Sequence, residues 1–539
     1  MLIIRHHRAK SRSCVSSDRD PKSRWILDVL SSQARVASYN KLPTPFCSSH
    51  PMATYTTSYG SPVNYPHAAQ RVSTNGPLLL QGRIILCLIL RWDCSSTHID
   101  FHAIDNLAHL SRERIPERLV HAKGAGAYGY FEATDDLSDI TSQTLFRTGN
   151  TVDATVRFST VAGESGSADT ARDVHGFSIK LKTDQGILDW VLLNTPTFFI
   201  RDPAKYPDLV HATKRNPRTN LKDPDMFWDF FSSNPETVHE IMMVFSDRGT
   251  PDGFHQQHGF GGTTFKWCKD DNTFHYVKVH VKIEGKVKTL DAATAIKLAG
   301  EDPDYGTRLL FEAIEAQNFP EWNVKIQTMT QEQAEGDYSN IAFDVTKVWP
   351  HADFPLRTIG KLVLNKNPEN FFDEIEQLAF APAHMIPYIE PSPDPLLQAR
   401  LFMYPDTQRY RLGVNNQQLP CNASISNVTN YQRAGTASFV SQGSRPNYES
   451  STQSLSFDGP PNAIDSQIND NYRHEKFDGT VYRDLSVVAP DDFVQPRALW
   501  NYWDKVQQTA FIDNVSASLT LIKDTQILRN QRTSYSACR

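Results

Sequence analysis

An arginine and a tyrosine near residue 400 have the spacing of two residues on one helix face. Ser392, as an N-cap, followed by Pro393 and Asp394, predicts a helix start, and Pro405 predicts that the helix ends at Tyr404. Arg400 lies four residues before Tyr404, so both side chains share a face. A nearby guanidinium favours the phenolate, which binds ferric iron and is a known axial ligand of haem. Taken alone, such a pair is more often a packing contact.

A second group of candidate residues centres on His121. It precedes the run Ala122–Ala127, in which small residues let a flat cofactor approach the backbone closely. A histidine can take up and return a proton at neutral pH. The hydroxyl of Ser159 is suited to orient this ring, and Arg157 to neutralise a buried carboxylate. Each of these residues alone is equally typical of a turn or a surface.

Eight segments reproduce, in the same order, motifs of one known family. They are residues 112–118, 121–126, 157–169, 214–217, 222–226, 245–249, 360–365 and 400–406. The chain thereby resembles the haem catalases of the small-subunit type, over roughly residues 53–81 and 100–520. Decomposition of hydrogen peroxide to water and oxygen is the activity that this resemblance implies.

The elements expected to position these residues are mainly strands. Apolar and polar residues alternate over 177–182 and 277–283, as in an antiparallel sheet, and helical spacing occurs over 101–110, 307–316 and 498–522. The resemblance implies an α+β fold, namely an antiparallel β-barrel with an N-terminal arm, a wrapping loop and a C-terminal helical region. The expected boundaries are a non-native or disordered extension (1–51), the arm (52–99), the barrel core with the distal pocket (100–365), the wrapping segment with the proximal ligand (366–440), the helical region (441–525) and a tail (526–539).

The resemblance also assigns roles around a haem b in a homotetramer. Tyr404 matches the proximal iron ligand, His121 the distal acid–base residue and Ser159 its supporting hydroxyl. In the implied mechanism, His121 takes a proton from one peroxide oxygen and delivers it to the other while the O–O bond breaks. The other matches to the haem site are Val120, Phe198, Tyr206 and Arg400 in the pocket and, at the propionates, Arg118, Arg157 and Arg411.

A dinucleotide is bound in part of the family. NADPH is therefore a further candidate ligand, and six residues match the positions that would hold it. They are His239, Ser246, Arg248, Lys282, Trp349 and His351.

The sequence departs from the family at the distal asparagine that positions peroxide. Leu193 occupies its place and Asn194 follows. Because successive strand residues face opposite sides, we expect Asn194 to reach the pocket only through a bulge or a register slip. Asn194 is kept as a candidate catalytic residue on that condition.

Three further departures concern the proximal side, the dinucleotide site and the arm. Thr263 replaces a histidine near the proximal haem face, and His258 replaces a dinucleotide-contacting asparagine. Residues 82–99 form an insertion with an exposed apolar run, which we interpret as translated intron sequence, with Met52 as the expected start.

Composition and charge limit the alternatives. The 539 residues carry a net charge of −6, which gives no reason to expect nucleic-acid binding, and the longest apolar run is too short to cross a membrane. The seven cysteines show no metal-binding or disulfide pattern, which favours a reducing compartment. The expected location is the peroxisome or the cytoplasm, although the chain does not end in a Ser-Lys-Leu signal.

Two functional hypotheses remain. The first is a working catalase whose turnover is lowered by Leu193. The second is a haem-binding relative that has lost catalase activity and acts on organic peroxides or as a non-catalytic subunit. Tyr404, Arg400, His121 and Ser159 favour the first hypothesis, whereas Leu193, Thr263 and the insertion favour the second.

Overall fold

The computed structural model describes residues 56–60, 62, 101–271, 273–448, 450–453 and 489–537. The predicted extension 1–51 and the insertion 82–99 lie outside these residues. The chain divides into two compact units, Met1–Arg114 and Ile115–Arg539. In the first unit, helix α3 spans Phe101–Leu110, which confirms the helix predicted there.

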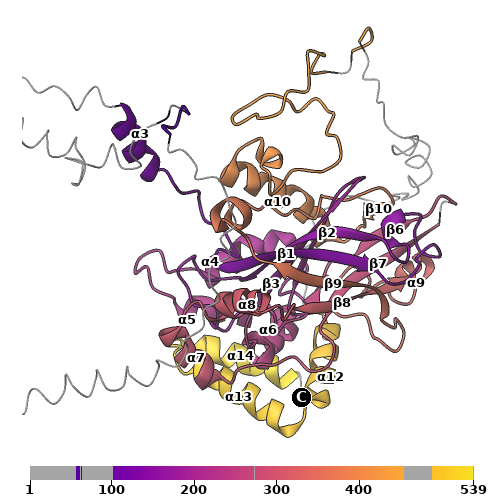
Figure 1. The fold of residues 1–539 in the computed structure, drawn as a ribbon. Coiled ribbons are helices and arrows are strands. Elements are labelled where there is room, and N and C mark those ends of the chain that lie inside the picture. Colours follow the sequence, from indigo (N-terminus) through magenta and orange to yellow (C-terminus); the bar gives the residue numbers. More distant parts are fainter. Residues whose placement is uncertain are drawn as a thin grey trace, which may run out of the picture. The chain divides into compact units, whose positions relative to one another are not determined.

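Within the described residues, the strands of the second unit form one antiparallel sheet that closes into a barrel, as the fold prediction requires (Figure 1). The sheet order runs β10-β6-β7-β5-β4-β3-β2-β1-β9-β8, and β7 also pairs with β8, so eight strands make the closed ring. The strands are β1 (Gly124–Ala133), β2 (Thr151–Thr160), β3 (His175–Thr183), β4 (Gly186–Leu193), β5 (Gly259–Phe260), β6 (Phe265–Cys268), β7 (Phe274–Lys282), β8 (Glu321–Met329), β9 (Arg357–Lys366) and β10 (Ile389–Pro391).

Period-two patterning places the apolar residues inside the barrel. Phe177, Ile179 and Leu181 of β3 are fully buried in the main apolar cluster, together with Val277 and Val281 of β7. The alternation read from the sequence is therefore confirmed in both strands. On β4, Trp190 and Leu192 belong to the barrel core, whereas Val191 and Leu193 on the opposite face line a cavity.

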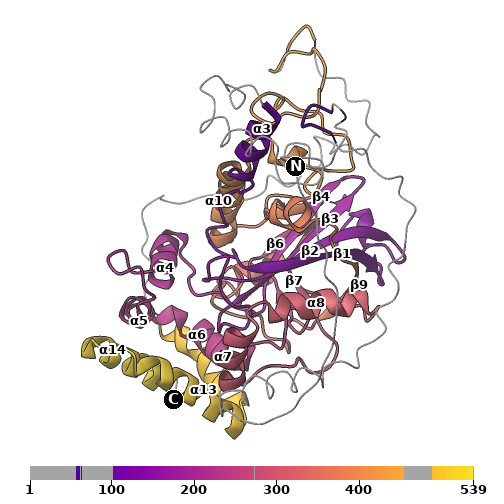
Figure 2. The ribbon, with the colours of Figure 1, turned by 60° about the vertical axis from the view of Figure 1, so that its left-hand side comes forward.

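Helices α5, α6, α13 and α14 lie together below the barrel in both views, whereas α10 lies above it (Figures 1 and 2). A second apolar cluster joins Trp228, Ile241 and Val244 of the middle helices to Phe511 and Val515 near the C-terminus. Among the described residues of the second unit, the α-helices are α4 (Tyr206–Thr213), α5 (Pro224–Ser233), α6 (Val238–Phe245), α7 (Ala292–Glu301), α8 (Tyr305–Glu315), α9 (Gln331–Glu335), α10 (Pro395–Leu412), α12 (Val494–Tyr502), α13 (Lys505–Leu519) and α14 (Thr525–Ala537).

The C-terminal helical region extends past the boundary at residue 525 that the sequence suggested. Helix α14 buries Ile527, Gln531 and Ser534, and it packs against α5. The segment expected to be a tail is thus part of the helical layer. No helix among the described residues is long and apolar enough to cross a membrane.

Helix α10 begins later than the sequence predicted. Asp394, not Ser392, is the N-cap residue, because its carboxylate accepts hydrogen bonds from the backbone of Leu396 and Leu397. Pro395 occupies the first helical turn. The Ser392 hydroxyl instead donates to the carbonyl of Thr264 at 2.6 Å.

The predicted end of this helix at Tyr404 is wrong, because α10 continues through Pro405 to Leu412. A proline inside a helix removes one backbone hydrogen bond and crowds the preceding turn. Arg411, in the last turn, donates to the carbonyls of Glu376 and Leu378 at 2.6 and 2.8 Å. These tertiary bonds hold the second half of the helix and offset the local preference for ending it.

Candidate functional site

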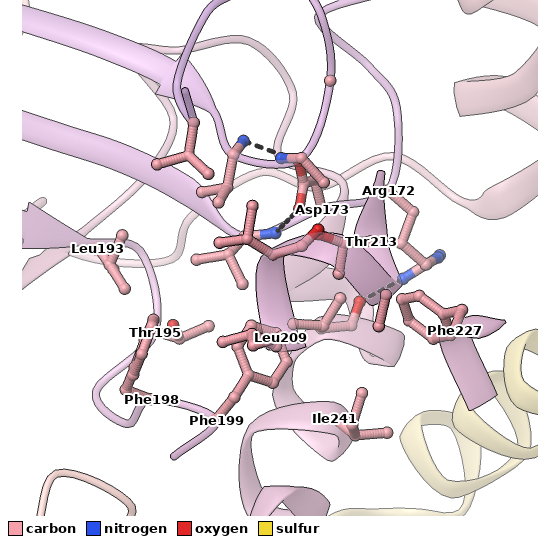
Figure 3. A pocket seen from close by; sticks show the side chains of 18 of the residues that line it. Arg172, Asp173, Leu193, Thr195, Phe198, Phe199, Leu209, Thr213, Phe227 and Ile241 are labelled. Carbon is pink, nitrogen blue, oxygen red and sulfur yellow. Dashed lines mark hydrogen bonds between the residues drawn. The ribbon is translucent and has the colours of Figure 1, made fainter. Parts of the chain in front are cut away.

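A cavity of about 900 Å³ lies between the outer faces of the strands and the helices α4, α5 and α10. Its lining is mostly apolar, and Figure 3 shows Leu193, Thr195 and Phe198 close together within it. Six of the predicted haem-site residues line this one cavity: Val120, His121, Phe198, Tyr206, Arg400 and Tyr404.

His121 is held from its ring and from its backbone. Its Nδ1 atom lies 2.8 Å from Ser159 Oγ, the partner predicted for it. Its backbone NH donates to Val161 O, and its carbonyl accepts from Arg157 Nη1 at 2.8 Å. With φ at 66°, it has a left-handed conformation that a non-glycine residue rarely adopts. These bonds fix the imidazole against the cavity.

The register of the sheet explains why the ring and the hydroxyl meet. Ser159 of β2 is paired with Gly176 of β3, which is paired with Leu193 of β4. A side chain at Gly176 would clash with Ser159 Oγ, and its Cβ would lie 2.7 Å from His121 Nδ1. The missing side chain therefore provides the space in which His121 and Ser159 contact each other.

The imidazole of His121 is neutral at physiological pH. Burial, reinforced by the positive charges of Arg157 and Arg118, lowers its pKa to about 3. A neutral imidazole can accept a proton, which is the state required of a general base.

The structure does not bring Asn194 into the cavity, so the candidate catalytic role given to this residue is corrected. β4 ends at Leu193 without a bulge, and Leu193 lines the cavity. Asn194 instead accepts a hydrogen bond from the backbone NH of His175 at 2.8 Å and donates to Arg248 O at 2.8 Å. Both ends of its amide are thus bonded to backbone groups of residues that do not line the cavity.

On the opposite side of the cavity, Arg400 and Tyr404 lie one turn apart on α10. Arg400 Nη2 lies 3.4 Å from the Tyr404 hydroxyl, and its guanidinium lies over the Tyr404 ring at 5.2 Å from the centroid. Arg400 also donates to Thr263 Oγ1 at 2.9 Å and to Val191 O at 3.0 Å. Thr263, noted above only as a departure, therefore fixes the arginine beside the candidate ligand.

Three buried guanidiniums gather behind His121, outside the cavity lining. Arg118 and Arg411 both donate to backbone carbonyls of residues 375–378. Among the described residues Glu376 forms an ion pair with Arg118 at 3.2 Å, and the Nε atom of Arg157 has no hydrogen-bond partner. Burial lowers the pKa of Arg411 to about 9. The cluster thus has an excess of buried positive charge, which an anionic group would relieve.

The six residues matched to a dinucleotide site are only partly brought together. Arg248 and Lys282 both lie near the ring of Phe260, with their cationic groups 5.7 and 5.6 Å from its centroid. Burial and the charge of Lys282 lower the pKa of His351.

The remaining three matched residues turn inward. His239 Nδ1 lies 3.1 Å from Thr346 O, and the Trp349 indole donates to Ile341 O. The Ser246 hydroxyl donates to Met243 O at 2.6 Å. These side chains support the site from behind rather than face an open surface.

Two acids near the cavity, one half-buried and one fully buried, were not found by sequence reasoning. Asp173 lines the cavity and accepts hydrogen bonds from the backbone NH groups of Val161 and Ala162 at 2.7 and 2.6 Å. Burial raises its pKa to about 6. Asp173 therefore fixes the residue whose carbonyl binds the His121 backbone.

The second acid is Glu240 of α6, which is fully buried. It accepts hydrogen bonds from the hydroxyls of Thr195 and Thr197 at 2.7 and 2.5 Å, and burial raises its pKa to about 8. An acid in an apolar helix normally faces solvent, so the sequence pattern around Glu240 carries no signal of this role.

Comparisons with known proteins agree on one family. The family model described as "Catalase" matches residues 56–455. The chain is 46% identical to the peroxisomal catalase of Candida albicans over 452 residues, which cover 83% of this chain and 87% of that protein. It is 50% identical to peroxisomal catalase A of Saccharomyces cerevisiae over 370 residues, 68% of each.

Solved structures give the same result. A crystal structure of a fungal catalase aligns with a TM-score of 0.80 at 43% identity, covering 90% of this chain and 94% of that one. Catalase A from Saccharomyces cerevisiae aligns with a TM-score of 0.79 at 42% identity, covering 90% and 96%.

Proposed function

The chain belongs to the catalase family and decomposes hydrogen peroxide to water and oxygen, and we propose that His121, Ser159 and Tyr404 perform this reaction at a bound haem b. One observation carries the assignment of residues. His121, held by Ser159 at 2.8 Å, and Tyr404, held by Arg400, line the same mostly apolar cavity.

Haem is the cofactor of catalases, and the residues present fit it. The Tyr404 hydroxyl would supply a hard oxygen ligand for ferric iron, and Arg400 Nη2 lies 3.4 Å from that oxygen. Arg118, Arg157 and Arg411 would bind the propionates, because their buried charges and the unpaired Nε of Arg157 require an anion. When bound, the haem supplies the iron that exchanges electrons with peroxide.

The chain's own contribution to the chemistry is proton transfer at His121. The neutral imidazole accepts the proton of one peroxide oxygen and returns it to the other, so that the second oxygen leaves as water. Ser159, bonded to Nδ1, keeps the ring orientation fixed through both transfers. The apolar wall of Val161, Phe198 and Leu193 limits the access of bulk water to the reacting oxygens.

The proposal is tested by oxygen evolution from hydrogen peroxide per mole of bound haem, on protein expressed with added haem. We expect an intense Soret band and oxygen release that scales with haem content. Bound haem without oxygen release would contradict the proposed roles. A protein that binds no haem would contradict the assignment of Tyr404 and the arginines.

We propose in addition that NADPH binds at Arg248 and Lys282, whose cationic groups both lie near the buried ring of Phe260. Two neighbouring cations suit a ligand with phosphates. A fluorescence titration with NADPH tests this site. Binding that is equally strong in Arg248→Ala and Lys282→Ala would refute it.

The proposal also includes the oligomeric state and the location of the protein. The chain forms a homotetramer, and it is located in the peroxisome or the cytoplasm. Phe402 and Tyr410 of α10 are 76% and 79% exposed, and Phe439 and Val440 of the following segment are 66% and 56% exposed, which supports burial against further copies of the chain. Peroxisomal catalases are among the relatives. Light scattering and cell fractionation test these two points.

A further inference from the structure

The turn that follows β4 is held from behind by a buried acid. Two residues of this turn, Thr195 and Phe198, line the cavity (Figure 3). The carboxyl of Glu240, on α6, is bonded at both oxygens, since Thr195 Oγ1 lies 2.7 Å from Oε1 and Thr197 Oγ1 lies 2.5 Å from Oε2. Glu240 is fully buried but does not line the cavity itself. Its side chain therefore connects α6 to the wall that Thr195 and Phe198 form.

The proton of Glu240 determines how these two bonds are made. A neutral carboxyl donates through its O–H and accepts at its other oxygen, whereas a carboxylate can only accept. With the proton in place, the acid can donate to one threonine hydroxyl and accept from the other. After the proton is lost, both hydroxyls must donate to a full negative charge that is removed from water. Burial raises the pKa of Glu240 to about 8, so this change takes place in weakly alkaline solution.

The charged groups of the elements packed against α6 do not neutralise this carboxyl by contact. Among the described residues, Glu240 is bonded to the two threonines, and Arg248, which is exposed, acts on it only through space. The other titratable groups nearby are bonded elsewhere, namely Glu236 to Lys205, Asp492 to Arg201, His239 to Thr346 and Arg497 to Ala537. Asp491, Lys505 and Asp513 are exposed, and the charge of Asp247 acts on Arg172. An ionised Glu240 is thus a buried charge to which none of these cations is bonded.

Resting on the proposed function, we propose that Glu240 is a positioning residue for the distal wall, and that loss of its proton in alkaline solution lowers the rate of peroxide decomposition. A buried carboxylate becomes more stable when water reaches it, and water can reach it only if the turn moves. A displaced turn carries Thr195 and Phe198 with it. The wall then orients peroxide less well and excludes bulk water less well, and both changes slow the reaction.

The test is the pH profile of oxygen evolution per bound haem, from pH 6 to pH 10, on the haem-loaded, full-length protein. Each profile is normalised to the rate of the same protein at pH 7, and haem content is read from the Soret absorbance at every pH. We expect the wild-type rate to fall severalfold, with a midpoint near pH 8. Glu240→Gln should show no such fall, because its amide keeps one donor and one acceptor but does not titrate.

Two further variants locate the titrating group. Thr197→Val removes one of the hydroxyls that lower the pKa of Glu240, so the midpoint should move to higher pH. Glu312→Gln neutralises an exposed acid and should keep the wild-type profile. Infrared difference spectra across the midpoint give a direct readout. The carbonyl band of a protonated carboxyl should disappear at alkaline pH in the wild type, and this loss should be missing in Glu240→Gln.

The possible results separate this inference from the proposed function. A wild-type profile that stays flat to pH 10, or an equal fall in Glu240→Gln, would overturn the inference alone. A fall in rate without loss of the infrared band would also overturn it, because another group would then be titrating. If the wild type evolves no oxygen at any pH, the proposed function itself fails, and this inference with it.

Discussion

Two walls of the cavity, one with Arg400 and Tyr404 and the other with His121 and Leu193, differ in whether a polar contact forms at the position where the sequence departs from the family. On the proximal wall, formed by Arg400 and Tyr404, the resemblance places Thr263 at a histidine position of the family, and the Thr263 hydroxyl accepts a hydrogen bond from Arg400 at 2.9 Å. On the distal wall, beside His121, the resemblance places Leu193 at an asparagine position, and the amide of the neighbouring Asn194 is bonded to the backbone of His175 and Arg248. The residue at the first position forms a polar contact, whereas the apolar side chain at the second cannot.

The difference follows from the elements that carry the residues. Arg400 has a long, flexible side chain on a helix, and it reaches three oxygens on different segments. Leu193 lies in a ladder in which a slip of one residue would turn every side chain of β4 to the other face. A long arginine side chain on a helix can reach a different hydrogen-bond partner. A residue of a strand cannot take the place of its neighbour, because the two side chains face opposite sides of the sheet.

The largest effect is expected on the proximal wall. Tyr404→Phe removes the only atom of this side chain that can bind iron, so haem content should fall severalfold and oxygen evolution should fall to background. Haem content is read from the Soret absorbance relative to protein. Retention of full haem content with normal activity would show that Tyr404 is not the ligand.

A smaller loss of haem affinity is expected when the hydrogen bond between Arg400 and Thr263 on the proximal wall is removed. Thr263→Val keeps the shape of the side chain but leaves one donor of Arg400 unpaired, at a cost of about 1–2 kcal/mol. We expect haem to dissociate roughly tenfold faster from this variant, as measured by transfer to an excess of apomyoglobin. Thr263→Ser, which keeps the hydroxyl, should behave like the wild type. Equal rates in all three proteins would rule out this role for Thr263.

The sequence predicted the residues of both walls but not all of their contacts. Alternation along β4 predicts that Leu193 and Asn194 face opposite sides of the sheet, but it could not exclude the bulge on which the candidate role of Asn194 depended. The continuation of α10 past Pro405 could not be predicted, since it depends on Arg411 and the distant carbonyls of Glu376 and Leu378. The bond from Arg400 to Thr263 likewise joins residues 137 positions apart.

The smallest effect is a change in the pH dependence of stability, and it concerns Glu240, which binds Thr195 and Thr197 in the loop after Leu193. The pKa of Glu240 is raised from 4.5 to about 8, so the folded protein holds a proton that the unfolded chain releases between these pH values. This contribution to stability is fully present below pH 4.5 and is lost as the pH rises to 8. Glu240→Gln removes it.

We therefore expect the stability of Glu240→Gln, relative to the wild type, to rise by about 1–4 kcal/mol between pH 5 and pH 8. Urea unfolding at the two pH values measures this change. The exposed Glu312→Gln serves as the matched control and should show the same pH dependence as the wild type. Parallel curves for wild type and Glu240→Gln would contradict the assignment of a buried neutral carboxyl.

The central claim is that His121 transfers the peroxide proton in this cavity. It is tested most directly by the rate of oxygen evolution per bound haem in the wild type and in His121→Ala, from pH 5 to pH 8. We predict a loss of about 10²–10⁴-fold in the variant with haem content preserved. We also predict a wild-type rate that shows no transition near pH 6.5, because the pKa of His121 is about 3. A variant that keeps its haem and evolves oxygen within tenfold of the wild-type rate would contradict the claim.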